Sequence, residues 1–87
     1  MNYKIEFTKG ALKQIKKLPE DIKQRIDVKI QELGIEPRPN GVKKLQDDDL
    51  YRIRVGDYRI VYQICDDVLL VSVVKVKHRR EVYRNES

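Results

Sequence analysis

The stretch YRIRVGDYRIVY, residues 51–62, decides the fold because it reads as a β-hairpin. On both sides of Gly56-Asp57, aromatic or aliphatic side chains alternate with other residues, most of them arginines. This alternation predicts two strands that each have one apolar face, and the glycine–aspartate pair predicts a two-residue turn between them. In such a hairpin Val55 pairs with Tyr58.

The same register brings arginines together on the other face of the hairpin. Arg54 lies opposite Arg59, and Arg52 lies two residues along the same face. Like charges that face each other across a ladder destabilise a sheet by roughly 0.2–1 kcal/mol per pair. The pattern therefore favours a bound anion, a phosphate above all. The alternative is a solvated basic face, which open antiparallel sheets commonly have.

Length and charge limit the other classes of function. A chain of 87 residues makes one domain, 1–87, with a modest core and no room for a second lobe. Its net charge of +5 favours polyanionic partners such as nucleic acid. The sequence has neither a long apolar run nor a signal-peptide pattern, so we expect a cytoplasmic protein without a membrane anchor.

The first half of the chain predicts one short strand and two helices. Apolar and charged residues alternate over residues 3–7, and Thr8 is a suitable N-cap for a first helix that ends at Leu18. Pro19 suits the first turn of a second helix, for which Gly34 is the expected C-terminal stop. The two amphipathic segments predict an antiparallel helical pair.

The second half predicts three strands. The hairpin is followed by a turn at Asp66-Asp67 and by a β-branched strand, residues 68–76, which we expect at the centre of the sheet. The expected fold is α+β, with the order β-α-α-β-β-β, a mainly antiparallel sheet and the helical pair on one face. Asp47–Asp49 read as a solvated turn rather than a metal site, because consecutive carboxylates point in different directions.

The segment KVKHRREVY, residues 75–83, places cations, an imidazole and an aromatic ring within a few positions. His78 is the only histidine of the chain, and an imidazole can act as a general acid or base near neutral pH. A surface histidine without a role is the other interpretation. Tyr83 either stacks on a nucleic-acid base or covers the edge of the core.

Taken together, these segments resemble the RelE/ParE superfamily of toxins, specifically the RelE-type ribosome-dependent mRNA interferases. The resemblance covers nearly the whole chain. It rests on the first strand with the helix start at Ala11-Leu12, the Leu18-Pro19 junction, the hairpin YRIRVGDYRIVYQ and the closing HRREVY. The resemblance implies a compact RelE-like fold and a metal-independent endoribonuclease without a cofactor.

The resemblance also implies a set of site residues on the basic face of the sheet. The implied catalytic residues are Arg52, Arg54, Arg59, His78, Arg79 and Tyr83. The implied RNA-binding residues are Arg52, Arg54, Lys77 and Arg80. Relatives often have glycine at the position of Lys77, whose long side chain either narrows the approach to the site or adds a phosphate contact.

The chemistry that the resemblance implies is attack of a ribose 2′-hydroxyl on the adjacent phosphorus. Arg59 and Arg79 suit a charge clamp, because guanidinium stays charged and pairs bidentately with phosphate. The general base is unassigned, since Arg52 and Arg54 stand where well-known members have lysines. Either His78 transfers the proton, or the substrate and the ribosome align the hydroxyl well enough for a weak base.

The resemblance implies partners as well: the ribosome with its mRNA, and a separate antitoxin chain that covers or distorts the basic site. A ParE-like protein, which has the same fold and inhibits DNA gyrase without cutting RNA, is the main alternative. A non-toxic basic RNA-binding module is a third interpretation.

Overall fold

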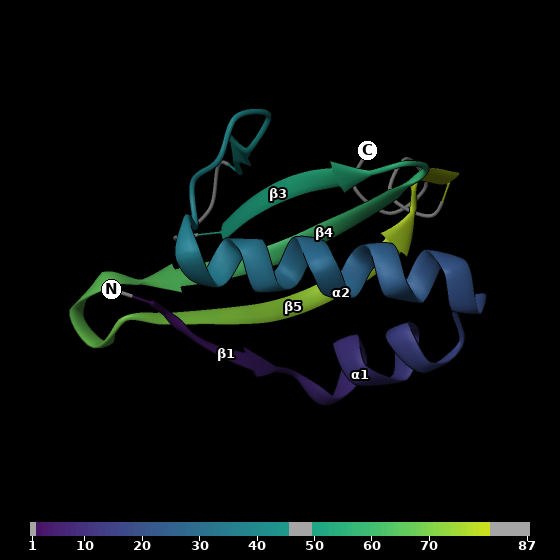
Figure 1. Cartoon of the computed structure of the whole chain (residues 1–87), viewed down its shortest axis with the longest axis horizontal. Coiled ribbons are helices and arrows are strands. Elements are labelled where there is room, and N and C mark those ends of the chain that lie inside the picture. The colour runs from purple at the N-terminus through teal and green to yellow at the C-terminus, as the bar shows by residue number, and fades with distance from the viewer. Residues whose placement is uncertain (1, 46–49, 81–87) are drawn as a thin grey trace.

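A five-stranded sheet carries two helices in the computed structural model of this chain, which describes residues 2–45 and 50–80 (Figure 1). The elements, in chain order, are β1 (Lys4–Phe7), α1 (Lys9–Lys16), α2 (Glu20–Ile35), β2 (Lys43–Lys44), β3 (Leu50–Val55), β4 (Tyr58–Cys65), a 3₁₀ turn η1 (Asp66–Val68) and β5 (Leu70–His78). The strand order is β1-β5-β4-β3-β2. Only the β1–β5 pair is parallel, which confirms the predicted α+β fold with a mainly antiparallel sheet.

The predicted element order lacks one strand, β2. Lys43 and Lys44 pair with Arg52 and Tyr51 at the edge of the sheet. A two-residue strand is too short to produce an alternating pattern, so the sequence did not predict it. Beyond these two pairs, the outer edge of β3 has no partner strand in the part of the chain that the structure describes. The predicted acidic turn, Asp47–Asp49, lies outside the described residues.

The helices begin where the sequence predicted. The Ala11 amide donates to Thr8 Oγ1 over 3.1 Å, which makes Thr8 the N-cap of α1. Pro19 precedes the first turn of α2, where Glu20 and Asp21 complement the positive end of the helix dipole. None of the helices in the described ranges is long and apolar enough to cross a membrane.

Gly34 does not stop α2, contrary to our expectation. The helix continues to Ile35, and the role of Gly34 is to let β1 approach closely. The Tyr3 amide donates to the Gly34 carbonyl over 2.6 Å, and a Cβ at position 34 would lie 3.3 Å from the Tyr3 carbonyl oxygen. A glycine near a helix end therefore indicated a packing contact here, not a C-cap.

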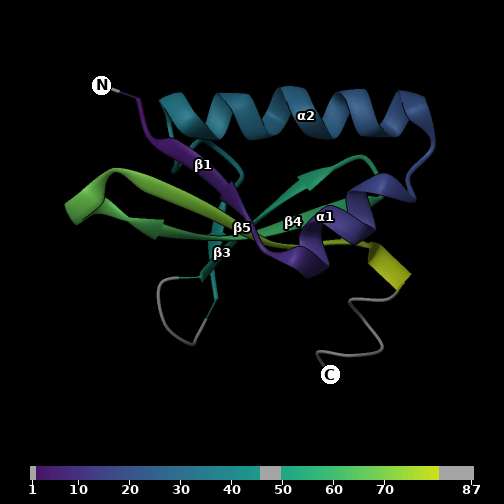
Figure 2. The same ribbon diagram turned by 90° about the horizontal axis from the view of Figure 1, so that it is seen from below.

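The core lies between the helices and one face of the sheet, which leaves the other face of the sheet uncovered by helix (Figure 2). Buried side chains come from both helices and from three strands: Ala11, Ile15, Ile26, Ile30, Leu33, Ile53, Val55, Ile60, Tyr62, Ile64, Val71, Val73 and Val76. Burying an aliphatic side chain of this size contributes about 1.5–3 kcal/mol. The core therefore fixes which face of each strand points away from the helices.

A bulge in β5 changes which residues of that strand face the core. Val61 pairs with Lys75, whereas the next residue, Tyr62, pairs with Val73, so Val74 is an extra residue. α1 contacts both sides of the bulge. Thr8 Oγ1 donates to the Val74 carbonyl over 2.9 Å, and the Val76 amide donates to Gln14 Oε1 over 2.7 Å.

A polar network at the opposite end of the sheet ties three segments together. Arg38 and Asp66 form an ion pair with Nη2 and Oδ2 2.9 Å apart, and the Tyr3 hydroxyl donates to Asp66 Oδ1 over 2.6 Å. The Arg38 guanidinium also lies over the Tyr51 ring, 5.3 Å from its centroid. These contacts join the loop after α2 to the β4–β5 turn and to β1.

Asp66 gives this network a pH dependence. Its hydrogen bond from Arg38, and next the one from Tyr3, holds the pKa of the carboxyl below its ordinary value. A lowered pKa in the folded state means that the stabilisation is complete above the pKa of the unfolded chain, about 3.9, and is lost as the pH falls below it.

We predict that Asp66→Asn flattens the acid limb of the stability curve. Between about pH 5 and pH 2, the free energy of unfolding should fall more steeply for the wild type than for the variant. Urea unfolding at a series of pH values measures this difference. Asp67→Asn, which changes the exposed neighbouring aspartate, is the matched control and should follow the wild type. Parallel curves for the wild type and Asp66→Asn would contradict the assignment.

Candidate functional site

The hairpin has the register that the sequence predicted. Val55 pairs with Tyr58, and Arg54 pairs with Arg59. Gly56, with φ of +60°, occupies the first turn position, as in a type II′ turn. The two-residue turn thus fixes the opposition of the two arginines.

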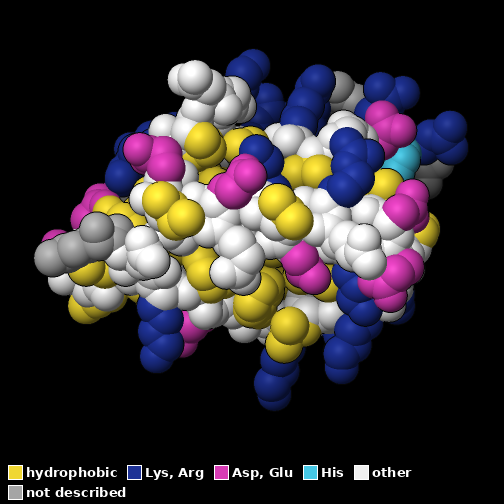
Figure 3. Space-filling model, in the orientation of Figure 1, with side chains coloured by type: hydrophobic (Ala, Val, Ile, Leu, Met, Phe, Trp, Pro, Cys, Tyr) yellow, Lys and Arg dark blue, Asp and Glu magenta, His cyan; other side chains and the backbone are white. Residues whose placement is uncertain are grey.

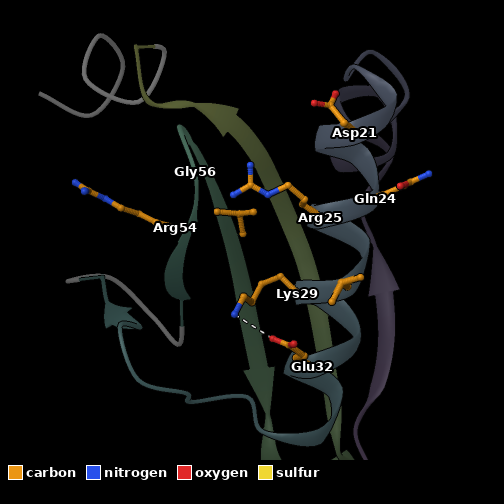
Figure 4. A pocket seen from close by; sticks show the side chains of 9 residues that line it. Asp21, Gln24, Arg25, Lys29, Glu32, Arg54 and Gly56 are labelled. Atoms are coloured by element: carbon orange, nitrogen blue, oxygen red, sulfur yellow. Dashed lines mark ion pairs between the residues drawn. The ribbon is translucent and has the colours of Figure 1, made fainter.

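These arginines lie on the face of the sheet that the helices do not cover. Residues that pair across neighbouring strands point to the same face, and Arg54 and Arg59 alternate with core residues of β3 and β4. Figure 4 shows Arg54 pointing away from α2, whereas Arg25 reaches from α2 toward Gly56. The basic face and the helix face are therefore opposite sides of the sheet, and they meet along β3, where Arg54 also borders the groove beside α2.

The arginines differ in how firmly the fold holds them. Arg59 is 4% exposed and is the only buried charged side chain among residues 2–45 and 50–80. Arg54 is exposed, and Arg52 is partly buried. Arg59 stands on β4 between β3 and β5, so it provides a fixed charge at the centre of the basic face.

β5 extends the basic face beyond the hairpin. Lys77 pairs with Arg59, and Lys75 pairs with Val61, so both lysines point to the basic face. Lys77 was expected from the sequence as an RNA-binding residue, but Lys75 was missed. The two-residue spacing of the lysines indicates a shared face. Only the bulge shows that this face is the basic one, because strict alternation from Val71 and Val73 would place both lysines in the core.

Arg79 joins the hairpin arginines at the turn. Its amide donates to the Asp57 carbonyl over 2.7 Å, and its Nε lies 4.0 Å from Asp57 Oδ1. A hollow of about 30 Å³ lies there, and its lining residues are Arg54, Gly56, Asp57, Tyr58, Arg59 and Arg79. Three guanidinium groups therefore surround one small hollow. Such an arrangement suits a phosphate and stabilises negative charge that develops on its oxygens.

The structure does not bring His78 to this hollow. His78 pairs with Tyr58, so its side chain is on the helix face, where the two rings meet edge to face with centroids 5.2 Å apart. The Arg80 amide donates to His78 Nδ1 over 3.2 Å, and the Arg80 side chain is exposed. Tyr83, the predicted aromatic of the site, lies outside the described residues.

A larger groove lies on the helix side of β3. It has a volume of about 710 Å³ and is lined by Asp21, Gln24, Arg25, Val28, Lys29, Glu32, Arg54, Val55 and Gly56. Its charges are mixed, because Lys29 Nζ pairs with Glu32 Oε1 over 3.0 Å, as the dashed line in Figure 4 shows. This groove shares Arg54 and Gly56 with the arginine hollow, but neither Arg59 nor Arg79 lines it.

The view from the helix side shows where charge gathers on that surface. Basic side chains lie along the two long edges in Figure 3, and acidic and apolar side chains lie between them. Within residues 2–45 and 50–80, no group of three or more His, Cys, Asp or Glu side chains is arranged to hold a metal ion. The strand pairing places Arg54, Arg59 and Lys77 side by side on the opposite face of the sheet.

Known proteins resemble this chain over nearly its whole length. A family model described as the ParE toxin of the type II toxin–antitoxin system parDE matches residues 5–83. The mRNA interferase toxin RelE of Escherichia coli is 33% identical, over 95% of this chain and 92% of that protein. A putative toxin of Methanocaldococcus jannaschii, RelE1, is 29% identical, over 98% and 99% of the two chains.

The fold has close structural counterparts too. A chain in the crystal structure of the RelE–RelB complex from Pyrococcus horikoshii superposes with a TM-score of 0.82 and is 32% identical, covering 91% of this chain and 97% of that one. The region that the family model matches, residues 5–83, contains the hairpin and the closing segment.

Proposed function

We propose that this chain, which belongs to the RelE/ParE superfamily of toxins of type II toxin–antitoxin systems, cleaves messenger RNA in the A site of the ribosome. The observation that carries the proposal is the convergence of Arg54, Arg59 and Arg79 on one hollow. The similar E. coli protein is named an mRNA interferase, which supports the same class of substrate.

The proposed reaction is metal-independent transfer within the RNA. The ribose 2′-oxygen forms a bond to the adjacent phosphorus while the bond from phosphorus to the 5′-oxygen breaks. The 2′-hydroxyl gives up its proton to an acceptor, and the leaving 5′-oxygen takes one up. Negative charge builds on the phosphoryl oxygens in the transition state, so fixed guanidinium groups lower its energy.

Each site residue has a proposed role in that reaction. Arg59 and Arg79 clamp the phosphoryl oxygens, and Arg52 and Arg54 bind the backbone beside them. Tyr83 holds a base and so turns the ribose into line. Lys77 and Arg80 add contacts to RNA phosphates.

We propose that a weak base, and not His78, accepts the proton of the 2′-hydroxyl. His78 is not among the residues that line the arginine hollow, and its ring packs edge to face on the Tyr58 ring. A positioned 2′-hydroxyl needs only a weak base when attack is intramolecular and the ribosome holds the message in line. We therefore assign His78 a packing role against Tyr58.

The proposed partners follow from the same premise. Similar chains have been crystallised as RelE–RelB antitoxin complexes, so we propose that a separate antitoxin chain neutralises this one. Ribosomes and messages are the targets, and the cytoplasm is the proposed place of action.

We predict that Arg59→Ala strongly reduces codon-phased cleavage and removes toxicity. Primer extension on a defined message in a purified translation system, with and without ribosomes, measures the cuts. The wild type should cut only with ribosomes, and the single-turnover rate of Arg59→Ala should fall about 10²–10³-fold, as for loss of one oxyanion contact. Lys13→Ala, which removes an exposed charge from α1, is the control and should cut like the wild type.

Because Arg59 is buried, its variant needs a second test. Arg79, with a 61% exposed side chain, can be changed to alanine without opening the core, and it should lose activity to a similar extent. The clamp would be ruled out if the two single variants, Arg79→Ala and Arg59→Ala, were both fully toxic and both shown by circular dichroism to be folded. Cuts by the wild type that need no ribosome would contradict the ribosome dependence.

We predict that His78→Gln keeps the single-turnover rate within about threefold of the wild type, since the side chain does not face the hollow. The rate should be measured between about pH 5.5 and 8.5, where a histidine base would produce a titrating limb. A drop of more than tenfold together with loss of that limb would show that His78 transfers the proton.

One finding favours a second candidate function. The matching family model is named for parDE, and the alternative predicted from the sequence is a ParE-like inhibitor of DNA gyrase. A gyrase supercoiling assay beside the primer extension separates the two. Intact message with inhibited supercoiling would favour the gyrase inhibitor.

A further inference from the structure

We infer that a second row of cations, Lys43, Arg52 and Lys75, binds the message phosphate next to the one that is cleaved. This inference rests on the proposed function and assigns a further part of the RNA-binding site. We call these three residues the second row. The first row is Arg54, Arg59 and Lys77.

The strand pairing places the second row across four strands. Lys43 pairs with Arg52, Arg52 pairs with Val61, and Val61 pairs with Lys75. Paired residues share a face, so these side chains line up on the uncovered face of the sheet. Val61 is 5% exposed and forms an apolar floor between the two flanking cations.

The two rows are spaced like neighbouring phosphates. Arg52 lies two positions before Arg54 of the first row, and Lys75 lies two positions before Lys77, whereas Lys43 of β2 has no counterpart in the first row. Two strand residues span about 6.7 Å. That distance matches the repeat of phosphates along an extended single strand, so a strand that crosses the sheet can meet one row with each phosphate.

The basic track is also bounded. The next row beyond Arg52 and Lys75 contains no cation, because it consists of Leu50, Gln63, Ser72 and the acidic Glu6 of β1. Toward the turn, the track ends at the hollow beside Gly56. The sheet thus offers two rows of cations, enough for the reacting phosphate and one neighbour.

Lys75 is part of the row because the bulge of β5 turns it outward. The extra residue at Val74 shifts the alternation, so that Val76 enters the core and Lys75 leaves it. Thr8 and Gln14 hold the backbone on either side of the bulge through their hydrogen bonds to Val74 and Val76. The fold therefore contains a specific device that presents this lysine, which a randomly exposed lysine would not need.

The test compares Lys75→Met with Lys13→Met, which removes a charge that is also exposed, from α1. Single-turnover cleavage is measured on programmed ribosomes at increasing toxin concentration. A contact with a non-reacting phosphate contributes to binding, so Lys75→Met should raise the half-saturating concentration about three- to tenfold. The rate at saturation should stay within about twofold of the wild type, as for uniform binding.

A second arm separates a phosphate of the message from one of ribosomal RNA. Messages carry a neutral methylphosphonate at one or the other phosphate beside the cleavage site. If Lys75 contacts one of these two phosphates, the methylphosphonate at that phosphate already removes the contact. On that message, Lys75→Met should then change the half-saturating concentration by less than twofold. The inference would be overturned if Lys75→Met raised the half-saturating concentration by the same factor on both modified messages as on the unmodified one. It would also be overturned if Lys75→Met did not change the half-saturating concentration on the unmodified message.

Failure of this inference is distinct from failure of the proposed function. A wild type that does not cut message on ribosomes contradicts the function itself. A wild type that cuts while Lys75→Met behaves like Lys13→Met leaves the function intact and removes only the second row. Thermal unfolding of Lys75→Met should match the wild type, which keeps a folding defect from imitating the effect.

Discussion

The pairing of Arg54 with Arg59 across the hairpin is the interaction on which the site depends. The two-residue turn at Gly56 imposes this pairing, and Coulomb repulsion between the guanidinium groups opposes it. The apolar faces of β3 and β4 hold the strands together, because their core residues cannot exchange faces without leaving the core. We propose that a sheet with this register acts as a preorganised anion site, since the free-energy cost of gathering the charges arises during folding and not during binding.

The rest of the fold places other cations around that pair. β5 contributes Lys77 opposite Arg59, and the chain then turns so that Arg79 meets the hairpin turn through Asp57. α1 stabilises the bulge that keeps the lysines of β5 out of the core. At the other end, the ion pair between Arg38 and Asp66 fixes the loop that leads to β2. The helices therefore cover one face of the sheet and also determine the charge pattern of the other.

The sequence predicted those parts of the site that depend on local rules. A two-residue turn sets the hairpin register, so the arginine pair could be read from residues 51–62 alone. The sequence alone could not predict which face of the sheet Lys75 and His78 point to, because this depends on a bulge that contacts from α1 hold in place. The expectation that Gly34 ends α2 was wrong for a similar reason. Gly34 packs against β1, which lies about thirty positions earlier in the chain. Tyr83 lies outside the described residues, so its role as the aromatic side chain of the site stays a prediction.

The most direct test of this account is the free energy of unfolding of Arg54→Thr in the free protein at low ionic strength. If the paired arginines repel each other, removing the exposed one should stabilise the fold by about 0.2–1 kcal/mol, and added phosphate should reduce the difference. Lys75→Thr is the matched control, because it removes a charge from the same face but lies opposite Val61. Equal effects of the two substitutions, or destabilisation by Arg54→Thr alone, would contradict the account.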